Sequence, residues 1–371
     1  MVTVRDIRSV IQKHFPVQGA EDWDNPGLQL GRLEAKVSRV LLALELSPDV
    51  LDEALNSEVD LILTHHPFIF KPLKCLTDET PDGKMLLDLA DKHIALMAAH
   101  TNLDSAPNAI NQKLCDDLAL SNRQVFIKHV PFAAYKIVVF VPQTHTDQVA
   151  QAMHNAGAGC VGQYKDVSFR APGTGCFTCG AESSPAIGQP GSVERVPENR
   201  LEMVVSARDL AAVTRAILQT HPYEEPAFDV FKLDSSVHGL TDLYGFGATG
   251  TLPEPIKLAD FLAHLKQLWN IDALRASGSP DKVIKKIAIM NGAGARYFTR
   301  CAPDIDAFIT GDCGHHDFDN ANRRGLALID AGHYDTEKFI PAILKKILDD
   351  AYGDALEVKL SRAQKRPFRV W

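Results

Sequence analysis

Histidines and acidic residues gather in four short segments of this chain. Six of the 14 histidines fall in them. Each segment follows a predicted strand, and open α/β sheets bind their ligands just beyond the carboxyl ends of strands. Imidazole and carboxylate side chains brought together in this way predict a metal site. The segments are Thr64-His-His-Pro67, His100-Thr-Asn-Leu-Asp104, Gly311-Asp-Cys-Gly-His-His-Asp317 and Asp330-Ala-Gly-His-Tyr-Asp-Thr-Glu337.

The adjacent histidines His65 and His66 favour two ions over one. Pro67 pushes His66 toward extended geometry, so the two imidazoles are expected to leave the backbone in opposing directions and to chelate one ion poorly. Two ions, each binding one histidine and bridged by a carboxylate or water, would use the pair as two-metal hydrolytic sites do. Asp104 and Glu337 are the candidate bridges, because a carboxylate has two oxygens to share.

His333 and Glu337 are four residues apart, a spacing that could place both on one helical face. Gly332 and a cap at Asp335 or Thr336 predict instead a loop that enters a helix, with Glu337 in the first turn. Imidazole combined with carboxylate favours divalent zinc, iron, manganese or cobalt over calcium or copper. The choice among those four metals stays open.

Other polar residues receive weaker assignments. His100 is either an orienting residue beside the metals or a core histidine, whereas His316 is expected to face the site and His315 the surface. The pair Cys176-Phe-Thr-Cys179 lacks the two further ligands of a structural zinc. The run Asn291-Gly-Ala-Gly294 lacks the third glycine of a dinucleotide fingerprint, so a tight strand-to-helix turn is expected there.

Composition limits the class of protein. With 371 residues, 45% hydrophobic and 23% charged, the chain predicts a globular protein of two domains. Its net charge of −8 disfavours nucleic acid as a partner. Residues 1–15 predict an amphipathic helix and no signal peptide, and no apolar run is long enough to span a membrane. Seven cysteines, an odd number, suit a reducing compartment, so the cytoplasm is expected.

Strands and helices alternate in both end regions of the chain, which predicts α/β sheets. The first region has expected strands at 40–46, 61–64 and 94–99 and helices at 49–56 and 84–92. The second has expected strands at 284–290, 307–310, 326–330 and 356–360 and helices at 317–324 and 336–349.

The middle of the chain differs from its ends. Its expected elements are strands at 135–142, 201–206 and 227–233 and helices at 146–156 and 207–220, with a Gly- and Pro-rich stretch at 157–191. This is close to the β-α-β-β-α-β order of a ferredoxin-like module. Segments 129–132 and 235–250 suit domain boundaries. We therefore expect a discontinuous α/β domain, residues 1–130 with 239–371, interrupted by an α+β insertion at 131–238.

The motifs together resemble the Nif-three-like family, also called the GTP cyclohydrolase I type 2 homologues. The insertion resembles the P-II/CutA-like module of longer family members, although Cys176-Phe-Thr-Cys179 departs from the run that relatives show there. The segments that carry the resemblance are Trp23-Asp-Asn-Pro-Gly-Leu-Gln-Leu-Gly31, Thr64-His-His-Pro67, His100-Thr-Asn-Leu-Asp104, Gly311-Asp followed by His316, Gly332-His-Tyr-x-Thr-Glu337 and, in the insertion, His221-Pro-Tyr-Glu-Glu-Pro226.

The resemblance implies a two-metal site and a toroidal homohexamer whose sites face an interior cavity. It implies a metal-dependent hydrolase in which a metal-bridging hydroxide attacks a small-molecule substrate, either in a GTP cyclohydrolase-like reaction or on another nucleotide or phosphoester. In the cyclohydrolase version His100 or His316 transfers protons, and Trp23 or Tyr334 lines the pocket. The implied metal ligands are the residues that spacing also selects: His65, His66, Asp104, His333 and Glu337.

Two other classes of function stay open at this point. The first is a non-catalytic metal-handling or regulatory protein whose insertion acts as a sensor; such a protein would release its ions readily to a chelator. The second is a nucleic-acid-binding regulator, which the net charge of −8 disfavours.

Overall fold

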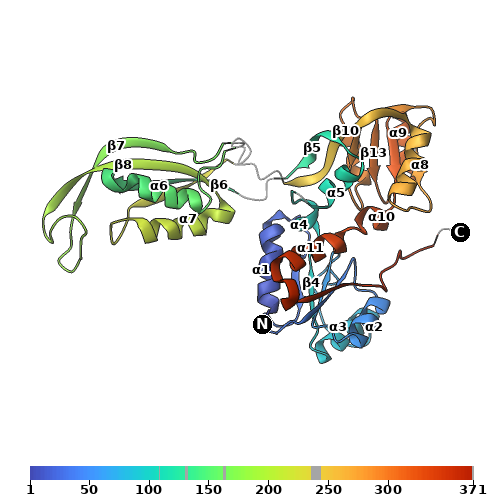
Figure 1. The fold of residues 1–371 in the computed structure, drawn as a ribbon, viewed down its shortest axis with the longest axis horizontal. Helices are drawn as coiled ribbons and strands as arrows, with labels where there is room; N and C mark the ends of the chain where they lie inside the picture. Colours follow the sequence, from blue (N-terminus) through green and yellow to red (C-terminus); the bar gives the residue numbers. More distant parts are fainter. Residues whose placement is uncertain (108, 130–132, 162–163, 235–243, 370–371) are drawn as a thin grey trace. The chain divides into compact units, whose positions relative to one another are not determined.

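The computed structural model describes residues 1–107, 109–129, 133–161, 164–234 and 244–369, and it divides into two compact units (Figure 1). Unit 1 consists of Met1–His129 with Leu243–Trp371, and unit 2 is Val130–Asp242. The expected boundary segments 129–132 and 235–250 lie partly outside the described residues. Where the second segment is described again it is already strand from Gly245 onward, not linker.

The first sheet of unit 1 has the strand order β1-β4-β3-β2-β15. Its four strands β2, β3, β4 and β15 run parallel, and β1 is an antiparallel edge. Helices α2 and α3 pack on one face, and α11, which contacts α1, packs against β2 and β15. Strands with both faces covered are mostly apolar, and every residue of β3 and β4 is buried. The bounds are β1 (Gly27–Leu30), β2 (Arg39–Ala43), β3 (Leu61–Thr64), β4 (Ala95–Ala98), β15 (Glu357–Leu360), α1 (Val4–His14), α2 (Pro48–Asn56), α3 (Pro81–Asp91) and α11 (Ile340–Tyr352).

The second sheet of unit 1 has the order β11-β14-β13-β12-β10-β5. The pattern predicted β12, β13 and β14 but missed β5, β10 and β11. In β10 the reason is glycine: a Cβ on Gly245 would lie 2.2 Å from the carbonyl oxygen of Ile127 in β5, so close pairing excludes the side chains that mark a strand. The bounds are β5 (Ser121–Lys128), β10 (Gly245–Lys257), β11 (Arg275–Ala276), β12 (Val283–Ile289), β13 (Ala307–Thr310), β14 (Ala327–Asp330), α5 (Ile110–Asp117), α8 (Leu258–Leu268) and α9 (His315–Arg323).

The two sheets of unit 1 are built alike at both ends of their central strands. Before β3, the Asp60 carboxylate accepts hydrogen bonds from two consecutive amides at the start of β2, at 2.7 and 2.9 Å. Before β13, Asp306 does the same for two consecutive amides within β12, those of Lys285 and Lys286, at 2.8 and 2.9 Å. Both strands end in a threonine, Thr64 or Thr310, whose carbonyl accepts from the residue after the next strand. The carboxyl ends of both sheets therefore carry matching loops, and these loops hold the histidine-rich segments.

The expected closing helix at 336–349 is two helices. Helix α10 (His333–Glu337) begins three residues earlier than predicted, and α11 begins at Ile340. Pro341 lies in the first turn of α11, where its missing N–H leaves no bond unmade, so it marks a start of helix and not its interior.

Unit 2 has the predicted β-α-β-β-α-β order of elements. Its antiparallel sheet has the strand order β7-β8-β6-β9, with the two helices packed on one face. Strand β7 lies within the Gly- and Pro-rich stretch and pairs along its whole length with β8, which is longer than expected. The bounds are β6 (Ala134–Pro142), α6 (Thr146–Asn155), β7 (Phe169–Thr178), β8 (Val193–Ser206), α7 (Ala207–Thr220) and β9 (Phe228–Leu233). Among the described residues of both units, every helix is too short or too polar to cross a membrane.

Candidate metal centre

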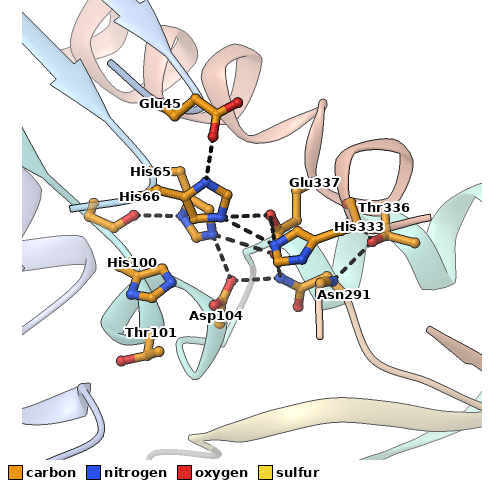
Figure 2. A network of polar contacts seen from close by, with 12 residues as sticks. Glu45, His65, His66, His100, Thr101, Asp104, Asn291, His333, Thr336 and Glu337 are labelled. Carbon is orange, nitrogen blue, oxygen red and sulfur yellow. Dashed lines mark hydrogen bonds and ion pairs between the residues drawn. The ribbon is translucent and has the colours of Figure 1, made fainter. Parts of the chain in front are cut away.

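The five residues selected by spacing come together within unit 1. His65 and His66 follow β3, and Asp104 ends the short helix α4 (Thr101–Asp104) after β4. His333 and Glu337 lie on α10, which follows β14 of the other sheet. Figure 2 shows these side chains turned toward one another. The cluster is therefore assembled from the strand ends of both sheets.

The five side chains form two overlapping groups that share Glu337. One group is His65, Asp104 and Glu337, the other is His66, His333 and Glu337, and within each the potential ligand atoms lie within 4.8 Å of one another. Oε1 of Glu337 lies 3.7 Å from His65 Nε2, and its Oε2 lies 3.1 Å from Nε2 of both other histidines. One oxygen thus faces each group, which is the arrangement of a bridging carboxylate. Asp104 belongs to one group only.

Two local expectations differ from the structure. The rings of His65 and His66 do not point in opposing directions; their centroids are 4.9 Å apart, because β3 ends at Thr64 and the strand alternation no longer applies. His333 and Glu337 do lie on one helical face, with His333 Nε2 and Glu337 Oε2 3.1 Å apart across one turn. That helix begins after Gly332, whose φ of +89° lets the chain turn into it earlier than the expected cap.

Each histidine of the two groups has a partner on its second ring nitrogen. When Nδ1 is held by a carbonyl or carboxylate oxygen, Nε2 is left with its lone pair toward the centre. These partners also fix the ring orientation before any ion binds. The Nδ1 contacts are His65 to the Ala99 carbonyl at 2.7 Å, His66 to Glu45 Oε2 at 3.7 Å and His333 to Asp312 Oδ2 at 2.7 Å.

Asn291 and Gly292 belong to the site although the sequence indicated only a turn at this point. The Asn291 amide donates to Asp104 Oδ1 at 2.8 Å and to Glu337 Oε1 at 3.2 Å, so it ties together carboxylates from both sheets. Gly292 has φ of +60°, and a Cβ there would lie 2.1 Å from Glu337 Oε1. A polar residue followed by glycine at a strand end was the only available signal.

Replacing Gly292 with alanine is expected to weaken metal binding roughly 10- to 100-fold, because the new methyl group must displace the shared carboxylate. The positive φ adds strain of about 1–3 kcal/mol to the folded state. Gly325→Ala is the matched control: its φ is +67° but nothing lies within 4 Å of its Cβ position. Chelator competition and chemical denaturation measure both effects. Equal metal affinities in the two variants would contradict the predicted collision.

The charges of the cluster are strongly coupled. Burial by itself would raise the pKa of the Glu337 carboxyl, but His65, His333 and His66 around it hold that pKa well below its usual value. Burial would likewise lower the pKa of His66, yet its contacts with Glu337 and Glu45 raise it to about 10. The pKa of His333 is raised to about 9, against the effect of burial, by Glu337 and by Asp312. Burial and the nearby Glu337 raise the pKa of Asp104.

The histidine nitrogens and carboxylate oxygens of the cluster are better placed to bind divalent cations than to bond to one another. His65 Nε2 and Glu337 Oε2 are buried and, among the described residues, have no partner in hydrogen-bond geometry. The Nε2 atoms of His66 and His333 face each other at 3.3 Å. Inward-facing ring nitrogens and carboxylate oxygens, once the rings have given up their protons, form the donor set that zinc, iron, manganese or cobalt prefers.

His100 also turns a ring nitrogen toward this cluster. Its Nδ1 lies 2.7 Å from Asp24 Oδ1, and its ring centroid is 5.1 Å from that of His65. The Asp24 side chain is fully buried and also accepts from the amide and hydroxyl of Thr101, at 3.1 and 2.5 Å. His100 is therefore held in orientation beside the centre, and with His65 and His66 it makes a third group of ligand atoms that lie within 4.8 Å of one another. His316 is different: it is exposed on α9, and its described ring contact is with His315, not with the cluster.

Asp24→Asn is expected to lower the free energy of unfolding by about 1–3 kcal/mol. The new amide nitrogen would face the buried donors of His100 and Thr101, whose hydrogen bonds the Asp24 carboxylate now accepts. Metal content should stay unchanged, since Asp24 belongs to none of the three groups that could hold an ion and touches them only through His100. Denaturant titration with elemental analysis checks both statements, with the exposed neighbour Asp22→Asn as control. A loss of metal from Asp24→Asn alone would show that His100 is itself a required ligand.

The fold and the cluster together define a class: an α/β protein with a candidate metal centre at the facing strand ends of two sheets. The chain belongs to the DUF34/NIF3 family (NGG1p interacting factor 3), whose family profile matches residues 2–367. A relative from Halalkalibacterium halodurans named "GTP cyclohydrolase 1 type 2 homolog" is 35% identical over 365 residues, 97% of this chain and 96% of the relative. One of the same name from Bacillus subtilis is 32% identical over 372 residues, covering 99% and 98%. The crystal structure of a Bacillus cereus protein related to NIF3 is similar with a TM-score of 0.88, 32% identity and coverage of 100% and 99%.

Proposed function

We propose that the protein is a metal-dependent hydrolase with a dinuclear centre, acting on a nucleotide or another phosphoester. The single observation that carries this proposal is the sharing of Glu337 between two histidine-containing groups, with one oxygen toward each. A buried carboxylate that faces two sets of ligand atoms is suited to hold two cations a few ångströms apart. The names of the relatives agree with a nucleotide substrate but describe those proteins only.

The chain's own residues would divide the work as follows. His65 and Asp104 would hold one ion, His66 and His333 the other, and Glu337 both. Such a pair of cations, when bound, lowers the pKa of a water molecule and polarises the bond to be cleaved. Asn291 donates to the Asp104 and Glu337 carboxylates and so holds them in fixed positions relative to each other. His100, with Asp24 holding its Nδ1, presents the opposite nitrogen to this space and could accept or return a proton there.

The test begins with elemental analysis of protein purified without chelator or added metal. About two transition-metal ions per chain are expected. Nucleotides and phosphoesters are then screened for hydrolysis before chelation, after chelation, and after restoring the same metal. Turnover should disappear with the metal and return with it. His65→Ala should lose about one ion and at least about 100-fold in turnover, because the second group keeps its own ligands.

Two outcomes would overturn the proposal. No metal in the protein, even after reconstitution, would mean that the histidines are structural. Two bound ions that are lost rapidly to a chelator, without turnover on any of these substrates, would favour the metal-handling function instead.

We further propose how the rest of the chain serves this function. Residues 131–238 are an inserted domain of P-II/CutA-like type, which the strand order β7-β8-β6-β9 supports. The chain assembles with copies of itself, as a homohexamer, which light scattering would test. It acts in the cytoplasm, a compartment that suits seven cysteines that are all free. Nucleic acid is not its partner, given the net charge of −8.

A further inference from the structure

An exposed aromatic pair lies next to the candidate metal centre. Trp23 and Phe70 are 48% and 44% exposed, although apolar side chains of this size are usually covered. Their ring centroids are 5.7 Å apart with the planes tilted by 49°, so neither ring covers the face of the other. Trp23 also meets the edge of His100, with centroids 6.1 Å apart. The pair is thus continuous with the centre through His100.

The pair is held in place from both sides. Asp24, next to Trp23, is anchored to His100 and to Thr101. On the side of Phe70, the Gln29 amide oxygen accepts from the Ile69 amide at 3.0 Å, and its nitrogen lies 3.3 Å from the Ile69 carbonyl. The Asn25 side chain donates to the same carbonyl at 2.6 Å. Exposed aromatic rings whose backbone is fixed in this way are ready for a ligand, because little ordering is left for binding to achieve.

Charge around the pair is unequal. Lys71 follows Phe70 directly and Lys74 comes three residues later; both are exposed, and within the described part of the chain neither forms an ion pair or a hydrogen bond. Asp22, before Trp23, is exposed. A bound anion is therefore expected on the Phe70 side, near the two lysines.

We propose that Trp23 and Phe70 form a stacking platform for the base of a nucleotide, with Lys71 and Lys74 attracting its phosphate. Planar heteroaromatic rings stack on tryptophan and phenylalanine because each offers a polarisable face of matching shape. The base would then lie toward the metal centre, on the side of Trp23 and His100, and the phosphate toward the lysines on the Phe70 side. That the platform presents a substrate to the centre rests on the proposed function. The binding of the nucleotide does not depend on turnover.

Binding is therefore measured on the full chain, both metal-loaded and after chelation, by calorimetry with guanosine monophosphate, guanosine and ribose 5-phosphate. Trp23→Ala should weaken guanosine monophosphate binding about 5- to 100-fold, the range for loss of one stacked base. Trp23→Phe should keep most of the affinity, because phenylalanine still stacks. Lys71→Ala should weaken the binding of guanosine monophosphate but not the binding of guanosine. This loss of affinity should be smaller in high salt. Phe169→Ala, an aromatic residue of unit 2 that is 63% exposed, is the matched control and should bind as wild type.

Tryptophan fluorescence gives a second readout. Trp269 is fully buried, so in a Trp371→Phe background the ligand-sensitive signal comes from Trp23. Guanosine monophosphate should quench it, and the quenching should vanish in Trp23→Phe while binding persists. Retained affinity in Trp23→Ala would overturn the platform. The platform would also be overturned if Trp23→Ala changed the mass measured by light scattering without changing the affinity. The pair would then be a contact between copies of the chain.

The two proposals fail in different ways. Nucleotide binding that depends on Trp23 without any turnover would leave the platform standing and remove the hydrolase. Metal-dependent hydrolysis of phosphoesters without nucleotide binding at Trp23 would leave the hydrolase standing and remove the platform.

Discussion

Glu337→Gln is expected to reduce the metal content of the purified protein from about two ions per chain to well below one. The reason is that Glu337 is the one member common to both groups, with an oxygen facing each. A glutamine keeps the size of the side chain but removes the charge and replaces one ligand oxygen with an NH2 group. That nitrogen cannot bind a cation, and the surrounding histidines would lose the negative charge that now raises the pKa values of His66 and His333.

Asp335→Asn is the control for this change. Asp335 is a buried acid on the same helix, but it accepts from Lys338 at 3.0 Å and from Arg366 at 2.7 Å, away from the cluster. Its substitution removes the same charge and should cost stability without releasing metal. Elemental analysis of both variants, with circular dichroism to confirm folding, is the measurement. Near-normal metal content in folded Glu337→Gln would rule out a bridging carboxylate.

Metal binding is expected to release protons and to tighten as the pH rises. In the metal-free protein the pKa values of His66 and His333 are about 10 and about 9, so these rings carry protons at neutral pH that a bound cation must displace. Affinity should rise about 100-fold per pH unit up to about pH 9, where two protons are released, then about 10-fold per unit to about pH 10, and level off above that.

The stability of the metal-free protein should depend on pH in the opposite sense. The pKa values of both histidines are raised above the usual 6.5, so their contribution is fully present below about pH 6.5 and is lost as the pH rises through about 9 and 10. Glu337 has a lowered pKa, so its contribution is present above its ordinary value of 4.5 and is lost as the pH falls through the lower folded value. Metal-free protein should therefore melt at lower temperature at about pH 9 than at about pH 6, and loaded protein should not.

Calorimetry in buffers of different ionisation enthalpy counts the released protons directly. Glu45→Gln supplies the matched variant: it keeps every ligand but removes one of the carboxylates that raise the pKa of His66. It should release fewer protons at neutral pH and show a shallower dependence of affinity on pH. No proton release in either protein would show that the histidines are already neutral, and equal release from both would show that Glu45 does not control the protonation of His66.

The sequence alone predicted the framework and the side chains of the site. Strands β3 and β13 were predicted residue for residue, because a short apolar run that ends in one threonine before a polar segment has few alternatives. The four histidine-rich segments were located at strand ends, and the structure brings five of their side chains together. Ligand types are visible in a sequence since they are a matter of residue chemistry, and strand ends are visible because hydrophobic periodicity stops there.

Only the tertiary structure decided how these residues are used. Asn291 contacts Asp104 across 187 positions of the chain, and His66 meets His333 across 267. Such contacts leave no local pattern, so Asn291 and Glu45 could not be selected beforehand, and Asp24 and Asp312, which lie in the motifs, could not be paired with His100 and His333. The choice of Glu337 over Asp104 as the shared carboxylate arises in the same way. It depends on which loops of two similarly built sheets face each other, and the packing of the whole unit determines that.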